Sequence, residues 1–463
     1  MKHVFLFGII YCLTSCSSAF LDIKPNSDIV IPTTLEDCRR LLDGDGRIGQ
    51  GMNLKFPSLG QLASDEYYYN FSTWQSTVYP HERTAYIWAD DVYEGEQHID
   101  DWEDAYHAIY ICNVVLDVLD RIEIEERNQI AYNDVKGTAL FFRAMWYHAL
   151  AEVFCLPYND NSAAQTLGLP LRTKPNVDEI TQRSTLAETY EFILADIDAS
   201  VNLLADKVPS DYRNRPSVCA AFALTARIQL VMGDYQSALA SAQQSLELYD
   251  QLLDYNDFEL EGDAVFDRYN PEVLVMTQIK GYLSIGAGNA ARNSFVDSTL
   301  IELYHTDDLR RHAFFTFDEF GQASRKSLYT TSISLYNCFN GPATDEVLLI
   351  EAECLARIGE LNKASQSLNI LLSKRMVTEN FEPLSFNHKE QALRTVLEER
   401  RKELVFRGAR WSDVRRLNVE GAGIQMKRVL NGESFVLEPN SPRYAFPIPE
   451  SEILFSNIKQ NVR

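Results

Sequence analysis

Apolar residues recur every three or four positions along most of the chain after residue 95, which is the spacing of one face of an α-helix. The segments 105–122 and 137–154 show this pattern clearly, and Phe142 and Trp146 would share one face of the second segment. A later helix is expected to begin at a Ser184 N-cap, because a serine hydroxyl can accept a hydrogen bond from a free N–H group of the first turn. The pattern predicts a mainly α-helical protein.

Two helical segments resemble each other. "ALTARIQLVMGDYQSAL" and "LIEAECLARIGELNKAS" each place an alanine seven residues before a glycine and a second alanine five residues after it. The glycines are Gly233 and Gly359, and the flanking alanines of the first copy are Ala226 and Ala238. This spacing is typical of a tetratricopeptide helix pair, in which small residues let two helices approach closely. The copies lie far apart, so we predict a tetratricopeptide-like helix-pair superhelix interrupted by insertions.

Two regions, 43–98 and 255–345, lack the helical pattern and are predicted to be large irregular insertions with a few short strands. The first is rich in Gly, Pro and Asn. The second contains the strand-like "EVLVMTQI" and the small-residue run "SIGAGNAARNS". The terminal segment "RYAFPIPESEILFSNIKQN" shows no helical period before Glu450. We expect the insertions to carry the functional site.

The first residues have the composition of a secretory signal. Lys2 and His3 precede an apolar run over 4–13 that is too short to span a bilayer. "LTSC" follows, in place of the small-residue cleavage site of an ordinary signal peptide, and it is similar to the bacterial lipobox. We therefore predict a signal peptide over 1–15 and a lipid on Cys16. The alternative is an ordinary signal peptide with a cysteine nearby.

The composition is that of a globular protein, with 46% hydrophobic residues. The formal net charge of −23 disfavours nucleic-acid binding, because an acidic surface repels a phosphate backbone. The remaining six cysteines form no C-x-x-C motif, and several lie in apolar helical segments. We predict that they are packing thiols. They are Cys38, Cys112, Cys155, Cys219, Cys338 and Cys354.

Two glycine-rich runs match dinucleotide-binding motifs only formally. Such a loop must follow a strand and open a helix within a β-α-β unit. "GDGRIG" (44–49) follows a helix-like segment, and "GAGNAA" (286–291) has no β-α-β alternation around it. The sequence also lacks zinc-ligand spacing and histidine clusters. We therefore predict no cofactor and no protein-ligated metal site, while a structural calcium ion in the insertions stays open.

Glu399 and Glu403 lie one turn apart and are the most plausible carboxylate pair for glycoside hydrolysis. Their neighbours Arg400, Lys402 and Arg407 offer ion pairs at helical spacing. A structural, ion-paired helix is therefore the favoured interpretation. We predict no catalytic residues.

A cluster of aromatic residues in the first insertion is the best candidate for a binding surface. Aromatic rings can stack on the C–H faces of sugars, and the surrounding Asn, Ser, Thr and Gln can bind hydroxyl groups. About half of the cluster is expected to be core, because alternate residues of an extended "YYYNF" would point inward. Trp74 is expected to be the member that faces solvent. The cluster comprises Tyr67, Tyr68, Tyr69, Phe71, Trp74 and Tyr79.

Together with the lipobox, ordered blocks along the chain resemble the SusD/RagB family of surface glycan-capture lipoproteins from Gram-negative bacteria. They include "FLDIKP", "LASDEYY", "GTALFFRAMWYHALAEVFCLPY", "EERRKELVFRGARWSDVRR" and "FPIPESEILFSNIKQN". The resemblance implies a SusD-like fold and an outer-membrane lipoprotein, anchored by its N-terminal lipid and exposed on the cell surface. It also implies a TonB-dependent, SusC-like transporter as partner, an oligosaccharide or peptide as ligand, and no catalysis.

The resemblance divides the mature chain into an N-terminal region over 16–270, with the aromatic insertion, and a C-terminal region over 271–463. The second contains a further tetratricopeptide-like pair over 345–375. The matching blocks are scaffold, so ligand contacts are chosen from the insertions. They are Tyr69 and Trp74 in the first, and Tyr282, Arg292 and Asn293 in the second. The alternative functions are a peptide-capturing importer subunit, a lipid-anchored glycoside hydrolase and a scaffold that binds only proteins.

Overall fold

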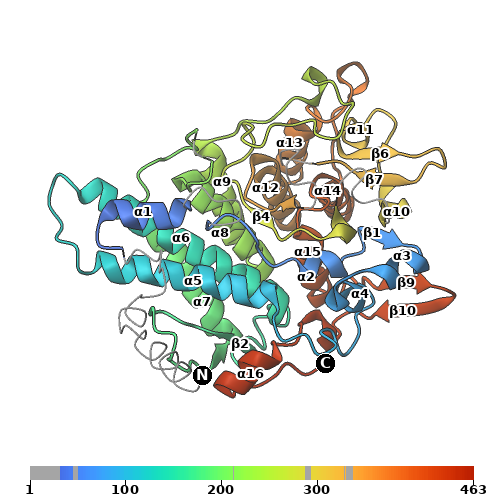
Figure 1. Cartoon of the computed structure of the whole chain (residues 1–463). Helices are drawn as coiled ribbons and strands as arrows, with labels where there is room; N and C mark the ends of the chain where they lie inside the picture. The colour runs from blue at the N-terminus through green and yellow to red at the C-terminus, as the bar shows by residue number, and fades with distance from the viewer. Residues whose placement is uncertain (1–31, 45–50, 212, 287–293, 328, 330–336) are drawn as a thin grey trace, which may run out of the picture.

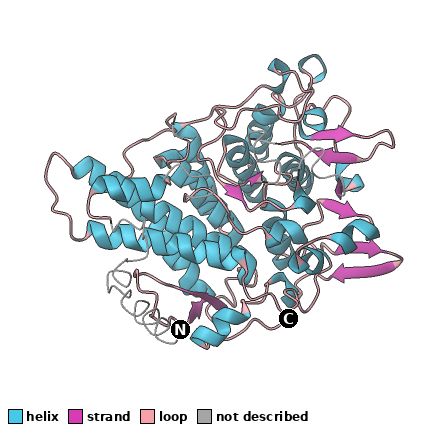
Figure 2. Ribbon diagram, viewed as in Figure 1, coloured by secondary structure: helices cyan, strands magenta, loops and turns pink. Residues whose placement is uncertain are grey.

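Helices dominate the fold, and strands form small two-stranded ribbons at its edge (Figure 2). The computed structural model describes residues 32–44, 51–211, 213–286, 294–327, 329 and 337–463. The long helices lie on the left and in the centre of Figure 1, and most of the ribbons lie on the right. The mainly α-helical fold with short strands is confirmed.

The N-terminal helices pack side by side in chain order. The predicted segments 105–122 and 137–154 lie largely within α5 (Asp100–Leu119) and α6 (Gln129–Phe154), which start earlier than predicted. The other helices of this half are α1 (Leu35–Asp43), α2 (Leu59–Ala63), α3 (Phe71–Ser76), α4 (Pro80–Tyr86), α7 (Leu186–Leu203), α8 (Val218–Met232) and α9 (Tyr235–Leu248).

The N-cap of α7 is Thr185, so the prediction of Ser184 was wrong by one residue. Thr185 Oγ1 accepts a hydrogen bond from the Glu188 amide at 3.2 Å, and the Glu188 carboxylate accepts one from the Thr185 amide at 2.7 Å. This reciprocal capping box needs a glutamate three residues after the cap. Only Thr185 has that spacing to Glu188, and Ser184 instead donates to the Leu169 carbonyl.

The two tetratricopeptide-like pairs are confirmed as helix hairpins. Gly233 ends α8 with φ 79°, and Gly359 ends α12 (Thr344–Ile358) with φ 89° before α13 (Leu361–Leu372). Helix α12 packs against α9 as well as against α13, so the hairpins are stacked although a long insertion separates them in sequence. The helix pairs therefore form one continuous scaffold.

We expect Gly233→Ala and Gly359→Ala each to lower the free energy of unfolding by about 1 kcal/mol. No atom lies within 4 Å of a Cβ built at either glycine, so the cost comes from the left-handed backbone and not from a clash. Urea denaturation should show a similar loss for each variant, and the losses should add in the double variant because the turns are independent. Unchanged unfolding midpoints would contradict this expectation.

Two of the ribbons, β1–β5 and β4–β8, join segments that are distant in sequence. Strand β1 (Tyr67–Tyr69) pairs antiparallel with β5 (Ser294–Val296), which brings the two insertions together. Only the last two residues of the strand-like "EVLVMTQI" form a strand. Earlier in this segment, Val273 makes a single isolated bridge with Ala343. The other pairs are β2 (Leu167–Pro170) with β3 (Arg183–Thr185), β4 (Gln278–Ile279) with β8 (Cys338–Phe339), β6 (Phe315–Phe317) with β7 (Ala323–Arg325), and β9 (Met426–Leu430) with β10 (Glu433–Leu437).

One large hydrophobic cluster extends through both halves of the chain. At its centre the rings of Phe56 and Trp146 stack at 3.7 Å, and Trp411 packs on Phe446. Helix α16 (Glu450–Ser456) starts at the predicted residue. The division at residue 270 stays a prediction. The remaining helices are α10 (Ser298–Ile301), α11 (Arg310–Phe314), α14 (Lys389–Glu403) and α15 (Ala409–Val419).

The six cysteines after Cys16 are all free and buried, which confirms their interpretation as packing thiols. Burial raises the pKa of Cys38 to about 11 and that of Cys112 to about 12, so these thiols stay protonated at neutral pH. Within the described ranges, no helix is both long and apolar enough to cross a bilayer.

Candidate functional site

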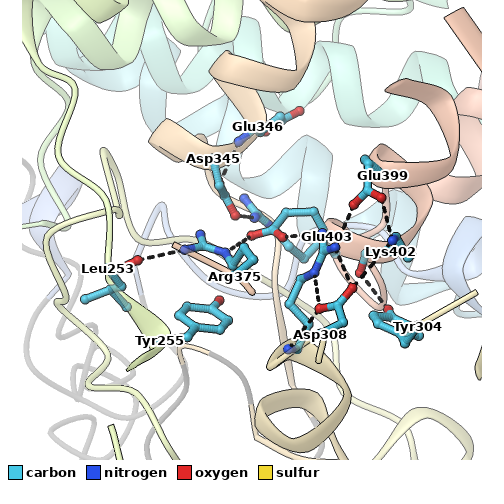
Figure 3. Close-up of polar contacts among 12 residues, drawn as sticks. Leu253, Tyr255, Tyr304, Asp308, Asp345, Glu346, Arg375, Glu399, Lys402 and Glu403 are labelled. Atoms are coloured by element: carbon cyan, nitrogen blue, oxygen red, sulfur yellow. Dashed lines mark hydrogen bonds and ion pairs between the residues drawn. The ribbon is translucent and has the colours of Figure 1, made fainter. Parts of the chain in front are cut away.

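The carboxylates of Glu399 and Glu403 are engaged in a buried ion-pair network (Figure 3). Both accept hydrogen bonds from the guanidinium of Arg310, at 2.6 and 3.0 Å. Asp308 binds the same guanidinium through two bonds of 2.7 and 2.8 Å, and the Arg310 side chain is fully buried. Glu403 also accepts from Arg375 at 2.8 Å. The ion-paired interpretation of the two glutamates is confirmed.

The partners in this network differ from those expected. Of the three predicted basic residues, only Lys402 contacts Glu399, at 2.5 Å. Arg400 pairs with Asp413, and Arg407 pairs with Asp345. The main partners, Arg310 and Arg375, come from α11 and from the segment after α13. Helical spacing within α14 carries no information about such long-range pairs.

The aromatic segment lies within the first insertion, between β1 and α4, and comprises residues 70–79. Helix α3 begins at an Asn70 N-cap, whose side chain accepts from the Thr73 amide at 2.9 Å. Trp74 is only half-exposed, because its indole N–H donates to the Arg83 carbonyl at 3.0 Å and its ring packs near Phe71. Phe71 is 37% exposed and Tyr79 is 51% exposed. Tyr79, and not Trp74, is therefore the most solvent-facing ring of the segment.

Tyr79 lies over a buried polar pair. Its ring centre is 5.7 Å from that of His81 and 6.0 Å from that of Tyr282. The Tyr282 hydroxyl is 2.8 Å from His81 Nε2, and His81 Nδ1 is 2.5 Å from a Glu96 carboxylate oxygen. Tyr282 itself is only 3% exposed, which corrects its choice as a ligand contact. The buried Tyr282 ring packs edge-to-face against the Tyr79 ring and helps to hold it in place.

A charged pair borders the same cluster. The Lys280 ammonium lies 5.1 Å from the centre of the Tyr282 ring and forms an ion pair with Asp100. Burial, together with the neighbouring Lys55, lowers the pKa of Lys280 to about 8. The Asp100 side chain is 47% exposed. Exposed rings thus lie beside polar groups that can bind hydroxyl groups.

The outward face of the β1–β5 ribbon adds two further rings. Tyr68 lies opposite Phe295, with ring centres 5.5 Å apart, and its hydroxyl accepts from the Gln322 amide at 3.1 Å. The alternate residues Tyr67 and Tyr69 point inward and are 1% and 4% exposed. Two of the six rings of the cluster are therefore core, which is fewer than the half that was expected. The choice of Tyr69 as a ligand contact is corrected, because strand alternation makes Tyr68 the outward ring.

The sequence of the chain matches two protein-family models. A family model described as "Starch-binding associating with outer membrane" matches residues 19–230, and one described as "SusD family" matches residues 345–462. The chain belongs to the SusD/RagB family. A SusD-like protein P2 of Formosa agariphila is 24% identical over 419 residues, which cover 78% of this chain and 79% of that protein.

Solved structures share the SusD fold of this chain. A putative sugar binding protein of Bacteroides vulgatus has a TM-score of 0.72 at 22% identity, covering 93% of this chain and 99% of the other. Surface glycan-binding protein A of Bacteroides fluxus has a TM-score of 0.68 at 17% identity, covering 94% and 99%. Residues 231–344 lie between the two matched segments and contain Tyr282, Phe295 and Gln322.

Several predicted features of this SusD/RagB-family chain lie outside the described residues. They are Cys16, Arg292, Asn293 and the glycine-rich runs 44–49 and 286–291 apart from their first glycines, and their assignments stay predictions. In the ranges that are described, no group of three or more His, Cys, Asp or Glu side chains is placed to hold a metal ion.

An internal cavity of about 100 Å³ is a weaker candidate site. Its lining includes His148, Glu152 and Arg227. Burial lowers the pKa of His148 to about 4, so the imidazole is neutral at pH 7, and Arg227 is paired with Glu346 at 2.5 Å. A cavity of this size accommodates a few water molecules and no oligosaccharide. The exposed aromatic surface is therefore the better site.

Proposed function

We propose that the protein is a cell-surface lipoprotein that binds oligosaccharides or polysaccharides and delivers them to a TonB-dependent, SusC-like transporter of the outer membrane. Membership of the SusD/RagB family supports this role, as do the sugar-binding and glycan-binding descriptions of its structural relatives. The single observation that carries the proposal is the exposed aromatic segment with Phe71 and Tyr79, set over the polar pair His81 and Tyr282.

The chemistry of this surface suits weak and reversible capture. Each ring contributes about 0.5–1.5 kcal/mol when it stacks on an apolar face. A few such contacts give affinities between millimolar and micromolar, which correspond to about 4–8 kcal/mol. Because a lipid on Cys16 would hold the protein beside its transporter, the effective concentration of captured ligand is high and tight binding is unnecessary.

We propose binding without catalysis. The carboxylate pair that best matched a hydrolase, Glu399 and Glu403, is buried and ion-paired, with no exposed face for a glycosidic bond. A peptide ligand in place of a glycan is the second candidate, because exposed aromatic rings also bind apolar peptide side chains.

Removing the rings of this segment should weaken glycan binding about two- to tenfold for each ring, because each substitution removes one stacking contact. The variants are Phe71→Ala, Trp74→Ala and Tyr79→Ala, and the matched control is Tyr269→Ala, which removes a tyrosine that is 48% exposed elsewhere. Retardation of the detergent-purified full chain in native gels with a panel of polysaccharides measures the effect.

We expect one polysaccharide to retard the parent and the control equally, and the three variants less, with no release of reducing sugar. Equal retardation of all variants would place the site elsewhere. Retardation by no polysaccharide, with binding of a peptide mixture that Tyr79→Ala abolishes, would favour the peptide-capturing function. Shortened polysaccharide would identify a hydrolase.

A further inference from the structure

An open cleft of about 620 Å³ lies beside strand β6 in the second insertion. One wall is the loop 260–262, and the other contains Phe317, His312 and Lys326. The volume lies in the range of small-molecule sites, and the lining combines an aromatic ring with cationic and polar groups. The cleft is separate from the aromatic segment around Tyr79.

Lys326 is a buried cation in this cleft, with 4% of its surface exposed. Its ammonium donates to the backbone carbonyls of Leu260 at 2.6 Å and His312 at 2.7 Å. An ammonium has three donors, so one remains beyond these two bonds. Across the described ranges, no carboxylate lies within ion-pairing distance of Lys326. A buried charge without a counterion is costly, which makes this position unusual.

A second cation, Arg311, stacks on Phe317, whose ring lines the cleft. The Arg311 guanidinium is 4.3 Å from the centre of the Phe317 ring, and it too has no carboxylate partner in the part of the chain that the structure describes. A guanidinium stacked on a ring keeps its edge N–H groups free for planar anions. Burial lowers the pKa of Lys326, while Asp263 and the cleft-lining Glu261 act in the opposite direction and favour its charged form.

We propose that this cleft binds the anionic group of an acidic glycan, a uronic acid carboxylate or a sulfate ester, through Lys326 and Arg311. The inference rests on the proposed glycan-binding function and narrows its ligand class. The cleft lies within residues 231–344, between the two segments that match the family models, so it belongs to the part of the chain that those matches do not cover.

The β6–β7 hairpin connects this cleft to the aromatic surface. Gln322, at the start of β7, donates to the Tyr68 hydroxyl on β1. Figure 1 places β1, β6 and β7 along the same side of the molecule. A single glycan chain can therefore contact aromatic rings with its neutral residues and the cleft with its charged residue.

The test is calorimetric titration of the detergent-purified full chain with three tetrasaccharides: a galacturonate oligomer, a sulfated galactan oligomer and maltotetraose. The variants are Arg311→Gln and Lys326→Gln, and Lys207→Gln is the control, because it removes one exposed positive charge far from the cleft in sequence. We expect one or both acidic oligomers to bind, about tenfold more weakly to each cleft variant and unchanged to the control. Binding of the acidic oligomer should also weaken as salt rises.

The oligomer that responds identifies the anion as carboxylate or sulfate. If Lys326→Gln lowers the melting temperature, the binding of acidic oligomers to Arg311→Gln decides between the outcomes, because Arg311 is only partly buried. Equal binding of acidic oligomers to all variants, or no binding of acidic oligomers while maltotetraose binds, would overturn the cleft assignment and leave glycan binding intact. Failure of every oligomer and of the polysaccharide panel would overturn both. If the binding of acidic oligomers depends on Arg311 but not on Tyr79, the result supports the cleft as a binding site without supporting the aromatic segment.

Discussion

Arg310→Met is expected to lower the free energy of unfolding by about 3–5 kcal/mol, the largest effect we predict for a single substitution. The substitution removes the group that binds Asp308, Glu399 and Glu403 together, at distances of 2.6–3.0 Å. Methionine fills similar space without a charge, so the main cost is three buried carboxylates left short of partners.

Arginine neighbours lower the pKa of two of these carboxylates, Asp308 and Glu403, in the parent protein. Although burial acts in the opposite direction, Arg310 lowers the pKa of Asp308, and Arg375 with Arg310 lowers that of Glu403. Both groups are therefore charged in the folded protein. Urea unfolding followed by tryptophan fluorescence measures the loss.

The matched control is Arg121→Met, which breaks the ion pair with Asp117 on the surface of α5 and its following turn. Its side chains are 63% and 46% exposed, so its loss should stay within about 1 kcal/mol. If Arg310→Met costs no more than this control, the network relaxes around the substitution, and the three carboxylates do not depend on Arg310 for their stability.

Glu66→Gln is expected to remove a contribution of about 3 kcal/mol from the pH dependence of stability between pH 4.5 and 8. Glu66 is 1% exposed, and its carboxyl group accepts from three neutral donors: the Gln61 amide at 2.7 Å, the Phe406 amide at 3.2 Å and the Ser64 hydroxyl at 3.5 Å. Burial raises the pKa of Glu66 to about 7, because the effect of desolvation exceeds the opposing effect of the Gln61 hydrogen bond.

The sign follows from proton uptake. Between the unfolded pKa of about 4.5 and the folded pKa of about 7, the folded state holds a proton that the unfolded state releases. Stability therefore falls as the pH rises through this window, by about 3 kcal/mol in all at 1.36 kcal/mol per pKa unit. Glutamine has no proton to lose, so the difference in stability between the parent and the variant should change by this amount across the window. Glu123→Gln, an exposed control, should keep the parental slope.

The titration of Glu353 changes the stability in the opposite direction and at lower pH. Although burial raises its pKa, the guanidiniums of Arg416 and Arg357 lower it to about 2. Its stabilising charge is present above pH 4.5 and is lost as the pH falls toward 2. Urea midpoints of the parent and of Glu66→Gln, measured from pH 3 to pH 8, test the assignment of Glu66, because the other buried groups titrate in both proteins. A difference between the two curves that stays constant from pH 4.5 to pH 8 would contradict it.

Sequence periodicity predicted the scaffold because the relevant signals are local. The apolar spacing of α6 and the glycines at the ends of α8 and α12 depend on neighbours within a few turns. The errors concern boundaries and partners. Ser184 and Thr185 are equally good caps as single residues, and only the distance to Glu188 distinguishes them.

The site was less predictable because it depends on pairing between distant segments. Alternation in "YYYNF" showed that alternate tyrosines differ in burial, but the direction is fixed by β5, whose Phe295 lies opposite Tyr68. The half-buried state of Trp74 depends on a carbonyl at Arg83 that comes within reach only when α4 folds back. The unpaired cations Arg311 and Lys326 carry no local motif at all.

The stacking of α12 on α9 also bears on how the binding region can diversify. The helices meet although the chain leaves the scaffold after α9 and returns only at α12. The entropy lost on closing such an excursion grows only with the logarithm of its length, so that doubling it adds about 0.6 kcal/mol. The excursion carries β5, the β6–β7 hairpin and the cationic cleft. Selection can therefore lengthen, shorten or replace the ligand-bearing segment at little thermodynamic cost to the helix pairs that hold it.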